Sequence, residues 1–571
     1  MNIHHRLRTI AIACFVLCGV RVSTFHAIGA PADLDAAFGG TGKVTTAIGS
    51  GDDYGYSIAV QNNGKIVVAG YSKNGSDDEV ALARYNADGS LDTAVNGTGK
   101  VTTSIGSVGI QGTGVVVQSD GKIVVSAISH NGTDNDFVLL RYSANGILDT
   151  SFSGDGIVIT NVGDDIAFSV ALQSDGKILV TGGSLNNFAL IRYNSDGSLD
   201  TTFNGTGIVN TPIGPANDTG WKVAVQSDLK IVVAGESFNG SNTDFAVVRY
   251  NTNGSLDTTF NGTGKVTTFI GTGDDVGYGL ALQSDGKIVV SGSSFNGTDR
   301  DFAVVRYNAN GSLDTTFNGT GKVTTPVGSG DDWGLRMVLQ SNGKIVVTGD
   351  SFTGSNKDIA VVRLNANGSL DTTFNGTGKV ITPIGPGNDT GNSMALQGDG
   401  KILVAASAII GGNADFVVVR YEGDLDTDRD GILDIYETGT GVFASSTDTG
   451  TSPINPDSDA DGLTDGQEVN TYLSNPNITD SDSDGFGDGF EVSTGFSPTS
   501  ALSTPDTLSS ILTAVEYRFN AALGISYRVE ASTDLLIWTT LETPVIGNGG
   551  VITRFYSIEG QPRRFFRSRR N

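Results

Sequence analysis

The sequence predicts an all-β protein whose main body is a seven-bladed β-propeller. Three observations support this: a unit of about 57 residues that returns seven times, four strand-like runs in each unit, and a repeat phase that lets the ring close. The composition agrees, because Gly supplies 79 of 571 residues, roughly twice the usual fraction, while β-branched and aromatic residues remain plentiful. Many short strands joined by Gly-rich turns are expected.

A Leu-Asp pair marks each repeat, at intervals of 57, 57, 51, 57, 57 and 57 residues. The leucines are Leu34, Leu91, Leu148, Leu199, Leu256, Leu313 and Leu370. A β-helix coil is far shorter than this interval, and an isolated unit of this length buries little core. The repeat therefore favours blades over a string of independent domains.

Each unit contains four strand-like runs, as in 311–364, where GKVTT is followed by MVLQ, KIVVTG and IAVVRL. A tight hairpin signal such as SDG or NNG separates the second run from the third. The first GKVTT run (Gly42–Thr46) precedes every other strand, and no such run follows the last Phe416–Tyr421 strand. The N-terminal strand is therefore expected to complete the last blade as a clasp, which removes an open edge.

The recurring pattern GSLDTTFNGTGKV…LQSDGKIVV…FAVVRYN resembles the delta-60 repeat family of exported bacterial proteins, over about 32–421. This resemblance implies a propeller-like repeat and no defined activity.

Two sets of repeated polar residues need an explanation. We expect the Asp of each Leu-Asp turn and the Arg that ends the fourth strand to have a structural role. They either pair with each other or form hydrogen bonds to the backbone. Acidic pairs such as Asp274–Asp275 and Asp331–Asp332 precede the second strand. They are either polar turn residues, which we favour, or a negatively charged rim that holds cations or a basic ligand. Trp221 and Trp333 lie near these loops. They either pack between blades or offer a flat surface to a ligand.

The N-terminus predicts export. Arg6 and Arg8 precede an apolar run the length of a signal h-region, and small residues at Ala30 and Ala32 suggest a signal peptide over 1–32, with a retained anchor as the alternative. Because the only cysteines, Cys14 and Cys18, lie inside it, the mature chain would have no disulfide or thiolate. We expect a secreted or cell-surface protein with no membrane span after signal removal.

A strongly acidic segment follows the repeats. Of the net charge of −26, −16 falls in the 68 residues 424–491, where seventeen acids face Arg429 alone. Nucleic acid is thereby an unsuitable partner.

Three windows of this segment share one spacing, with acids at loop positions 1, 3, 5, 9 and 12, Gly at 6 and an apolar residue at 7. Ca²⁺ takes six to eight oxygens, and this spacing supplies them from carboxylates and from the position-7 carbonyl. The predicted calcium ligands are Asp426, Asp428, Asp430, Ile432, Asp434, Glu437, Asp457, Asp459, Asp461, Leu463, Asp465, Glu468, Asp480, Asp482, Asp484, Phe486, Asp488 and Glu491. A solvated acidic linker is the alternative, and Mg²⁺ is less suited because it prefers a smaller octahedral shell.

Residues 424–498 resemble bacterial thrombospondin type 3 repeats and, more distantly, dockerin loops. The resemblance implies a calcium-stiffened connector, although the cysteines of the animal form are missing. After a linker over 499–511, alternating runs predict a small β-sandwich over 512–571. Its Arg-rich tail could dock on the acidic segment or on an anionic envelope, or form a solvated edge strand.

No enzymatic motif is present: the mature chain keeps His130 alone among histidines, and it has no nucleophile elbow, Walker loop or zinc motif. We therefore predict a non-catalytic calcium-binding repeat protein whose propeller loops bind an unknown extracellular protein or glycan, as in adhesion. The alternatives are a hydrolase or lyase acting on extracellular polysaccharide through the acidic pairs, and a purely structural envelope or matrix component.

Overall fold

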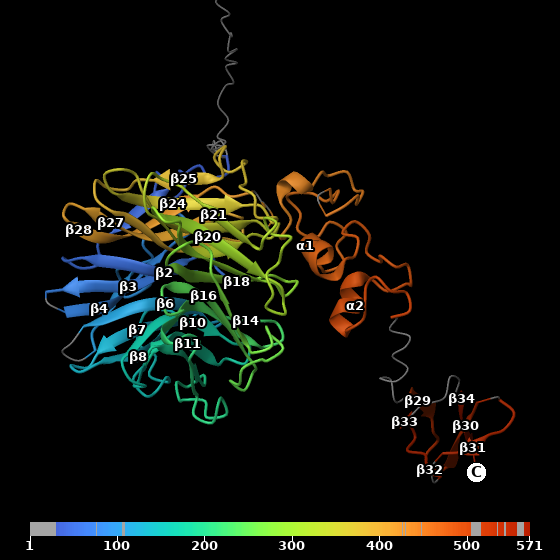
Figure 1. Cartoon of the computed structure of the whole chain (residues 1–571). Coiled ribbons are helices and arrows are strands. Elements are labelled where there is room, and N and C mark those ends of the chain that lie inside the picture. Colours follow the sequence, from blue (N-terminus) through green and yellow to red (C-terminus); the bar gives the residue numbers. More distant parts are fainter. Residues whose placement is uncertain are drawn as a thin grey trace, which may run out of the picture.

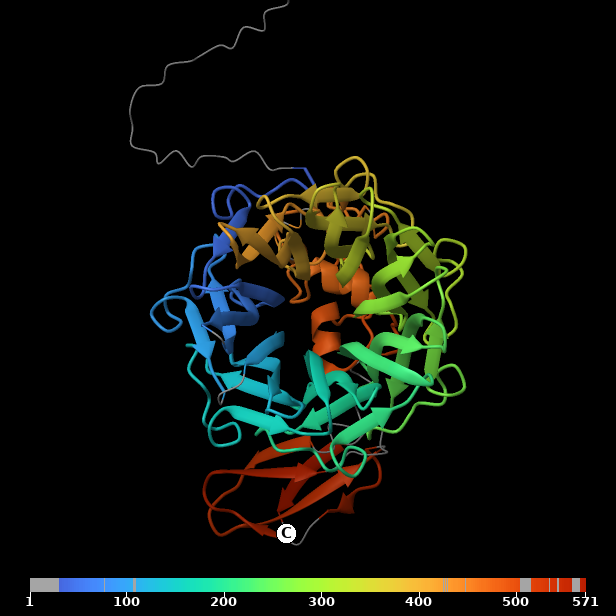
Figure 2. The same cartoon turned by 60° about the vertical axis from the view of Figure 1, so that its left-hand side comes forward.

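The structure is a computed structural model that describes residues 30–75, 77–105, 109–424, 426, 428, 430–446, 448–503, 515–533, 535–541, 544–556 and 565–570. Seven four-stranded antiparallel sheets are arranged in a ring (Figure 2), followed by an acidic connector and two small sheets (Figure 1). The predicted all-β fold with seven blades is confirmed. Among the described residues, no helix has the length and apolar character needed to span a membrane.

Each blade runs from an inner strand to an outer strand. The inner strands are β2 (Asp53–Val60), β6 (Ile110–Val117), β10 (Asp165–Leu172), β14 (Ala216–Val225), β18 (Asp275–Leu282), β22 (Asp332–Leu339) and β26 (Asp389–Leu396). The second strands are β3 (Ile66–Asn74), β7 (Ile123–His130), β11 (Ile178–Ser184), β15 (Ile231–Phe238), β19 (Ile288–Phe295), β23 (Ile345–Phe352) and β27 (Ile402–Ile410). The third strands are β4 (Asp77–Tyr85), β8 (Asn135–Tyr142), β12 (Asn187–Tyr193), β16 (Thr243–Tyr250), β20 (Arg300–Tyr307), β24 (Lys357–Leu364) and β28 (Asn413–Tyr421). The outer strands are β5 (Lys100–Thr103), β9 (Ile157–Thr160), β13 (Ile208–Thr211), β17 (Lys265–Thr268), β21 (Lys322–Thr325), β25 (Lys379–Thr382) and β1 (Lys43–Thr46).

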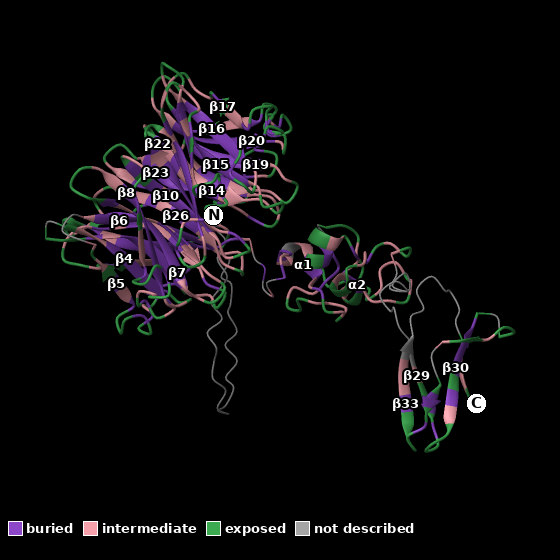
Figure 3. Cartoon of the chain, turned by 90° about the horizontal axis from the view of Figure 1, so that it is seen from below, coloured by how far each residue is buried: buried purple, intermediate pink, exposed green. Residues whose placement is uncertain are grey.

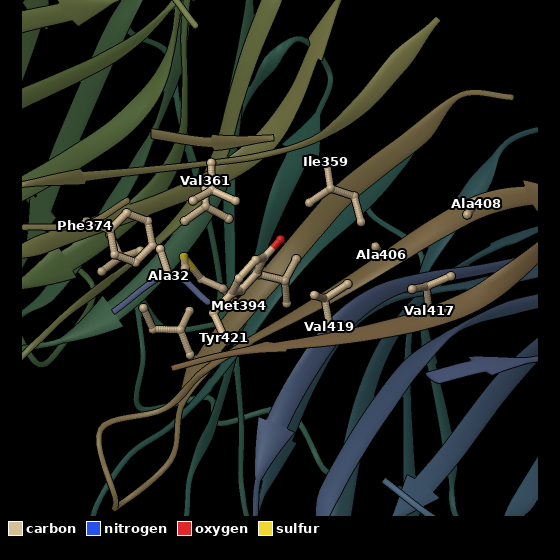
Figure 4. Close-up of a cluster of buried hydrophobic side chains, with 14 residues drawn as sticks. Ala32, Ile359, Val361, Phe374, Met394, Ala406, Ala408, Val417, Val419 and Tyr421 are labelled. Atoms are coloured by element: carbon tan, nitrogen blue, oxygen red, sulfur yellow. The ribbon is translucent and has the colours of Figure 1, made fainter. Parts of the chain in front are cut away.

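The hydrophobic core lies between neighbouring blades. The second and third strands are apolar on both faces because the adjacent blades cover both sides of each sheet. Figure 4 shows one such layer, in which Ile359 and Phe374 of the sixth unit pack against Met394 and Val417 of the seventh blade. Figure 3 shows buried residues throughout the ring. Each apolar layer therefore needs two neighbouring blades.

The first strand closes the ring. β1 pairs with β28, with Lys43 opposite Val419 and Thr46 opposite Phe416, so the last sheet has the order β1-β28-β27-β26. The clasp that the repeat phase predicts is therefore present. Ala32 is buried in the same seam, and its N–H donates to the carbonyl of Glu422 at 2.9 Å. Most of the predicted signal peptide, 1–29, lies outside the described residues, and cleavage after Ala32 stays a prediction.

The expected Arg–Asp pair forms in every repeat. The Arg Nε lies 2.7 or 2.8 Å from the Asp Oδ2 in the pairs Arg84–Asp92, Arg141–Asp149, Arg192–Asp200, Arg249–Asp257, Arg306–Asp314, Arg363–Asp371 and Arg420–Asp35. Arg249 also donates to the carbonyl of Ala309 in the next repeat at 2.6 Å, and its guanidinium lies 4.8 Å from the ring centre of Phe260. Each pair therefore fixes its own turn, and in six of the seven repeats the arginine also joins that turn to the neighbouring blade, whereas Arg363 contacts Asp424 instead.

The connector has short helical turns, η1 (Asp434–Tyr436), α1 (Asp465–Gln467), the π-helical turn η2 (Glu468–Tyr472) and α2 (Asp488–Thr494). Beyond it, β29 (Val515–Asn520) pairs with β33 (Val551–Tyr556), while β30 (Ser526–Ser532) pairs with β31 (Thr539–Thr540), β32 (Val545–Ile546) and β34 (Phe565–Arg570). Both sheets share one apolar core, which includes Phe519, Val529 and Ile552. In the basic tail, Arg567 pairs with Glu530 at 2.7 Å and covers Trp538, so this arginine is engaged within its own module.

Candidate functional site

The three acidic loops of the connector adopt one repeated geometry. In each loop the carboxylates at positions 1, 3 and 5 offer oxygens within 4.8 Å of one another, in the groups Asp426–Asp428–Asp430, Asp457–Asp459–Asp461 and Asp480–Asp482–Asp484. Position 6 has φ of 98°, 101° and 100° at Gly431, Gly462 and Gly485, a left-handed conformation that favours glycine. The N–H of this glycine donates to the position-1 carboxylate at 3.2, 3.2 and 2.9 Å. The chain thus curls its acids around one point.

A helical turn begins at position 9, and the Glu at position 12 directly follows it in the first two loops and lies within α2 in the third. Thr464 caps the turn of the second loop, accepting a hydrogen bond from the backbone N–H of Gln467. Glu437, Glu468 and Glu491 are buried, with exposed fractions of 4%, 0% and 0%. Their carboxylates face inward, where ordinary surface acids would lie in water.

Position 9 joins neighbouring loops. Asp465 of the second loop groups with Asp430 and Glu437 of the first, and Asp488 of the third loop groups with Asp461 and Glu468 of the second. A backbone contact accompanies each group: the N–H of Gly466 donates to Asp430 Oδ2 at 3.0 Å, and the N–H of Gly489 donates to Asp461 Oδ2 at 2.8 Å. The sequence assigned position 9 to its own loop; Asp465 and Asp488 also lie close to acids of the preceding loop, and which cation they would bind stays a prediction.

The remaining predicted ligands stand apart from these groups. Asp434, at position 9 of the first loop, belongs to none of the acidic groups found in the described part of the chain. At position 7, the side chains of Ile432 and Leu463 are buried, and Phe486 stacks on Phe490 with ring centres 6.0 Å apart. The ligand role of the position-7 carbonyls stays a prediction.

The electrostatics of the loops are unfavourable without a cation. Burial, with repulsion from Asp428 and Asp430, raises the pKa of Glu437 to about 8. Burial, with repulsion from Asp459 and Asp461, raises the pKa of Glu468 to about 9. Within the described residues, Glu437 Oε2, Glu468 Oε2 and both oxygens of Glu491 are buried without a hydrogen-bond partner. Buried acids with unsatisfied oxygens suit a hard cation, so these Asp-rich groups could bind metal ions.

The connector is anchored on the ring. Asp424 lies 3.0 Å from Arg363 Nη1 and 2.9 Å from Lys344 Nζ, and it accepts a hydrogen bond from Asn342 at 3.0 Å. Asn342 and Lys344 belong to the β22–β23 hairpin, so the connector starts at the hairpin side of the ring.

The acidic pairs at the opposite side of the ring bind backbone. Asp275 is buried and accepts the N–H of Ile270 at 2.6 Å. Asp274 accepts the N–H of Thr243, and Asp331 that of Arg300, each at 3.0 Å, and both donors belong to the preceding blade. These contacts support the interpretation as polar turn residues and give the pairs the task of joining blades.

A cavity of about 300 Å³ lies at the centre of the ring, lined by residues from all seven inner strands. Trp221 lines it, and its indole N–H donates to Glu236 at 3.2 Å. Trp333 lies instead beneath Arg300, whose guanidinium is 4.5 Å from the ring centre. The sequence analysis singled out Trp221 but did not predict the cavity. A residue near the start of each inner strand varies from blade to blade, and this variation was the available signal.

Comparison with known proteins identifies the repeat. Seven stretches, 61–94, 118–152, 173–203, 226–260, 283–317, 340–374 and 397–429, match the family described as Domain of unknown function (DUF5122) beta-propeller. The chain therefore carries seven copies of the DUF5122 beta-propeller repeat. No curated protein matches the chain in sequence.

Several solved structures are distantly similar. A catalytically inactive virginiamycin B lyase from Staphylococcus aureus is 13% identical with a TM-score of 0.40, covering 66% of this chain and 98% of its own. The polysaccharide lyase Uly1 is 13% identical with a TM-score of 0.38, covering 66% and 91%. Sqt1 from Chaetomium thermophilum is 11% identical with a TM-score of 0.36, covering 66% and 98%. At this level the similarity says nothing about activity.

Proposed function

We propose that this is an exported, non-catalytic calcium-binding protein, in which the propeller binds an extracellular protein or glycan and residues 424–498 form a calcium-stiffened connector to the C-terminal module. The observation that carries the proposal is the set of buried carboxylates in the three loops, where oxygens of Glu437, Glu468 and Glu491 have no hydrogen-bond partner among the described residues. Calcium bound there would replace mutual repulsion by attraction.

Calcium fits the donor set better than other metals. The groups offer carboxylate oxygens alone, which excludes a thiolate or imidazole site of the zinc type. Each loop gathers enough oxygens for the large, flexible shell of Ca²⁺, whereas Mg²⁺ demands a small octahedral one. Millimolar extracellular calcium would fill even sites with dissociation constants of about 10⁻⁴–10⁻³ M.

The grouping of position 9 with the preceding loop supports a connector role. A cation held by Asp430 and Glu437 would also attract Asp465 of the next loop, so binding would fix the angle between the two loops. The same holds for Asp461, Glu468 and Asp488. Calcium would thereby stiffen the path from ring to C-terminal module, in the manner of the thrombospondin type 3 repeats that the segment resembles.

The binding role of the propeller is tested on arrays of extracellular glycans and matrix proteins, with the mature chain in calcium and in chelator. We expect specific binding that a propeller fragment without the connector retains. An array without any specific signal would favour the purely structural role, and turnover of a polysaccharide would contradict the non-catalytic assignment.

A further inference from the structure

Every inner strand carries a β-bulge at the same place. The pairing with the second strand skips one residue after Gly55, Gly112, Ala167, Gly220, Gly277, Gly334 and Gly391. The skipped residues are Tyr56, Thr113, Phe168, Trp221, Tyr278, Leu335 and Asn392. A bulge bends its strand and re-aims a side chain, and bulges are common beside binding sites.

All seven skipped side chains line the central cavity of about 300 Å³, and all are half-buried. The bulge thus turns one residue from each blade toward a common point. The Gly or Ala before the skipped residue and the apolar residues that end the strand recur from blade to blade, whereas the skipped residue changes. A purely structural position would repeat with its neighbours, so this variation points to a ligand site.

One side of the cavity is an arc of aromatic rings from three consecutive blades. The ring centres of Phe168 and Trp221 lie 3.9 Å apart, and those of Trp221 and Tyr278 lie 4.9 Å apart. Such rings offer flat apolar faces, and they stand in a half-open cavity where a buried core would normally cover them. Asn392 and Gln111 add amide groups to the lining.

Arg336 lines the cavity beside this arc, and Lys222, which is not one of the lining residues, lies close enough to feel its charge. The residue after the skipped one is Ser or Gly in five blades, but it is Lys222 in the fourth and Arg336 in the sixth. Arg336 donates to the carbonyl of Tyr278, and neither cation forms an ion pair with any carboxylate in the described part of the ring. Burial, together with the charge of Arg336, lowers the pKa of Lys222 to about 8. Two unpaired like charges held together in a partly buried site are unfavourable unless an anion joins them.

We propose that the central cavity binds the acidic sugar residue of a glycan, with the aromatic arc against the apolar face of the sugar ring and Arg336, reinforced by the nearby charge of Lys222, on its carboxylate or sulfate. This inference rests on the proposed binding function and names its site and ligand class. Arginine pairs well with planar oxyanions, and amides pair with hydroxyl groups. The cavity is at the small end of ligand sites, which suits a sugar ring.

The site is accessible from the side away from the connector. The bulges lie near the start of each inner strand, whereas the connector is anchored at the hairpin where β22 ends. Figure 2 shows the connector behind the ring in a view along its centre.

Calorimetric titration of the calcium-loaded mature chain tests the proposal. The probes are oligoglucuronate, sulfated cello-oligosaccharide, neutral cello-oligosaccharide of equal length and phenylacetate. We expect the two anionic oligosaccharides to bind at least about tenfold more tightly than the neutral one, as loss of a charged contact predicts. Arg336→Gln and Lys222→Gln should each weaken binding about tenfold, whereas Lys177→Gln, the same change on an outlying hairpin, should not.

Two further variants keep the test decisive. Arg336→Lys retains the charge and should retain most of the affinity, even where Arg336→Gln folds poorly. Trp221→Phe should remove the ligand-induced change in tryptophan fluorescence while keeping binding. Equal binding of the neutral oligosaccharide, tighter binding of phenylacetate, or no anionic binding at all would overturn the assignment. Glycan binding that survives Arg336→Gln would overturn this site but leave the proposed binding function standing.

Discussion

Asp465 links the first two acidic loops, and replacing it by asparagine separates two assignments of position 9. The substitution Asp465→Asn preserves the size of the side chain, and an amide oxygen can still accept the N–H of Ser458, now 2.7 Å from Asp465 Oδ1. What the variant loses is one of the three negative charges in the group with Asp430 and Glu437.

The magnitude follows from the spacing of these oxygens. Two unit charges 4.8 Å apart repel by roughly 3.5 kcal/mol at an effective dielectric constant of about 20. Because burial and the neighbouring acids raise the pKa of Glu437 to about 8, a proton already relieves part of this repulsion at neutral pH. We expect Asp465→Asn to stabilise the metal-free connector by about 1–3 kcal/mol and to weaken calcium binding by about tenfold to a hundredfold.

Hydrogen exchange of peptides covering the first loop, together with calcium titration, measures both effects. Asp465→Asn should raise protection of residues 430–437 in chelator and lower it in calcium. Asp448→Asn, the same change outside the acidic groups, should do neither, and Asp434→Asn should have the smaller effect of the two position-9 variants. If Asp465→Asn instead changes the protection of residues 457–468 alone, position 9 binds the cation of its own loop and the reasoning is refuted.

Three other predictions concern the ring and the connector. Arg249→Met breaks the buried pair with Asp257 but leaves Lys230 3.1 Å from that carboxylate, so the remaining charge is not fully unpaired. We expect the free energy of unfolding to fall by about 3 kcal/mol and the melting temperature to fall by about 4 °C in calorimetry. An unchanged melting temperature would contradict the blade-joining role. In the folded chain the pKa values of Glu437 and Glu468 are raised from an ordinary 4.5 to about 8 and about 9. The protonated acids therefore stabilise the metal-free fold fully below pH 4.5, and this stabilisation is lost as the pH rises through 8 and 9. In chelator the chain should therefore be more compact at pH 5 than at pH 9 by small-angle scattering, whereas the opposite order would show that the acids do not repel. Deleting 33–46 should expose the edge of β28 and cause aggregation in sedimentation experiments, and a monomeric, fully stable product would argue against the clasp.

The ring could be predicted because its information is local and repeated. The hairpin signals set four strands in each unit, and the position of the unpaired Gly42–Thr46 run relative to Phe416–Tyr421 sets the clasp. The Arg–Asp pair was predictable for the same reason, since a contact made in every blade leaves a residue at the same place in every unit. Arg249 and Asp257 show it in the fourth blade at 2.7 Å.

The finer features of the sites depend on contacts between units. The grouping of Asp465 with Glu437 follows from how two loops pack, which the spacing inside one loop does not encode. The bulge at Trp221 adds a residue to one strand without disturbing the apolar pattern on either side, so alternation alone gives no sign of it. The backbone contact of Asp274 likewise involves a donor 31 residues away in the preceding blade.

The central claim, a binding ring on a calcium-stiffened connector, is tested most directly by hydrogen exchange over the whole mature chain in calcium and in chelator. We predict that removing calcium increases exchange strongly across 426–503 and leaves the blades between 43 and 421 unchanged. Equal exchange of the connector in both conditions would contradict the account.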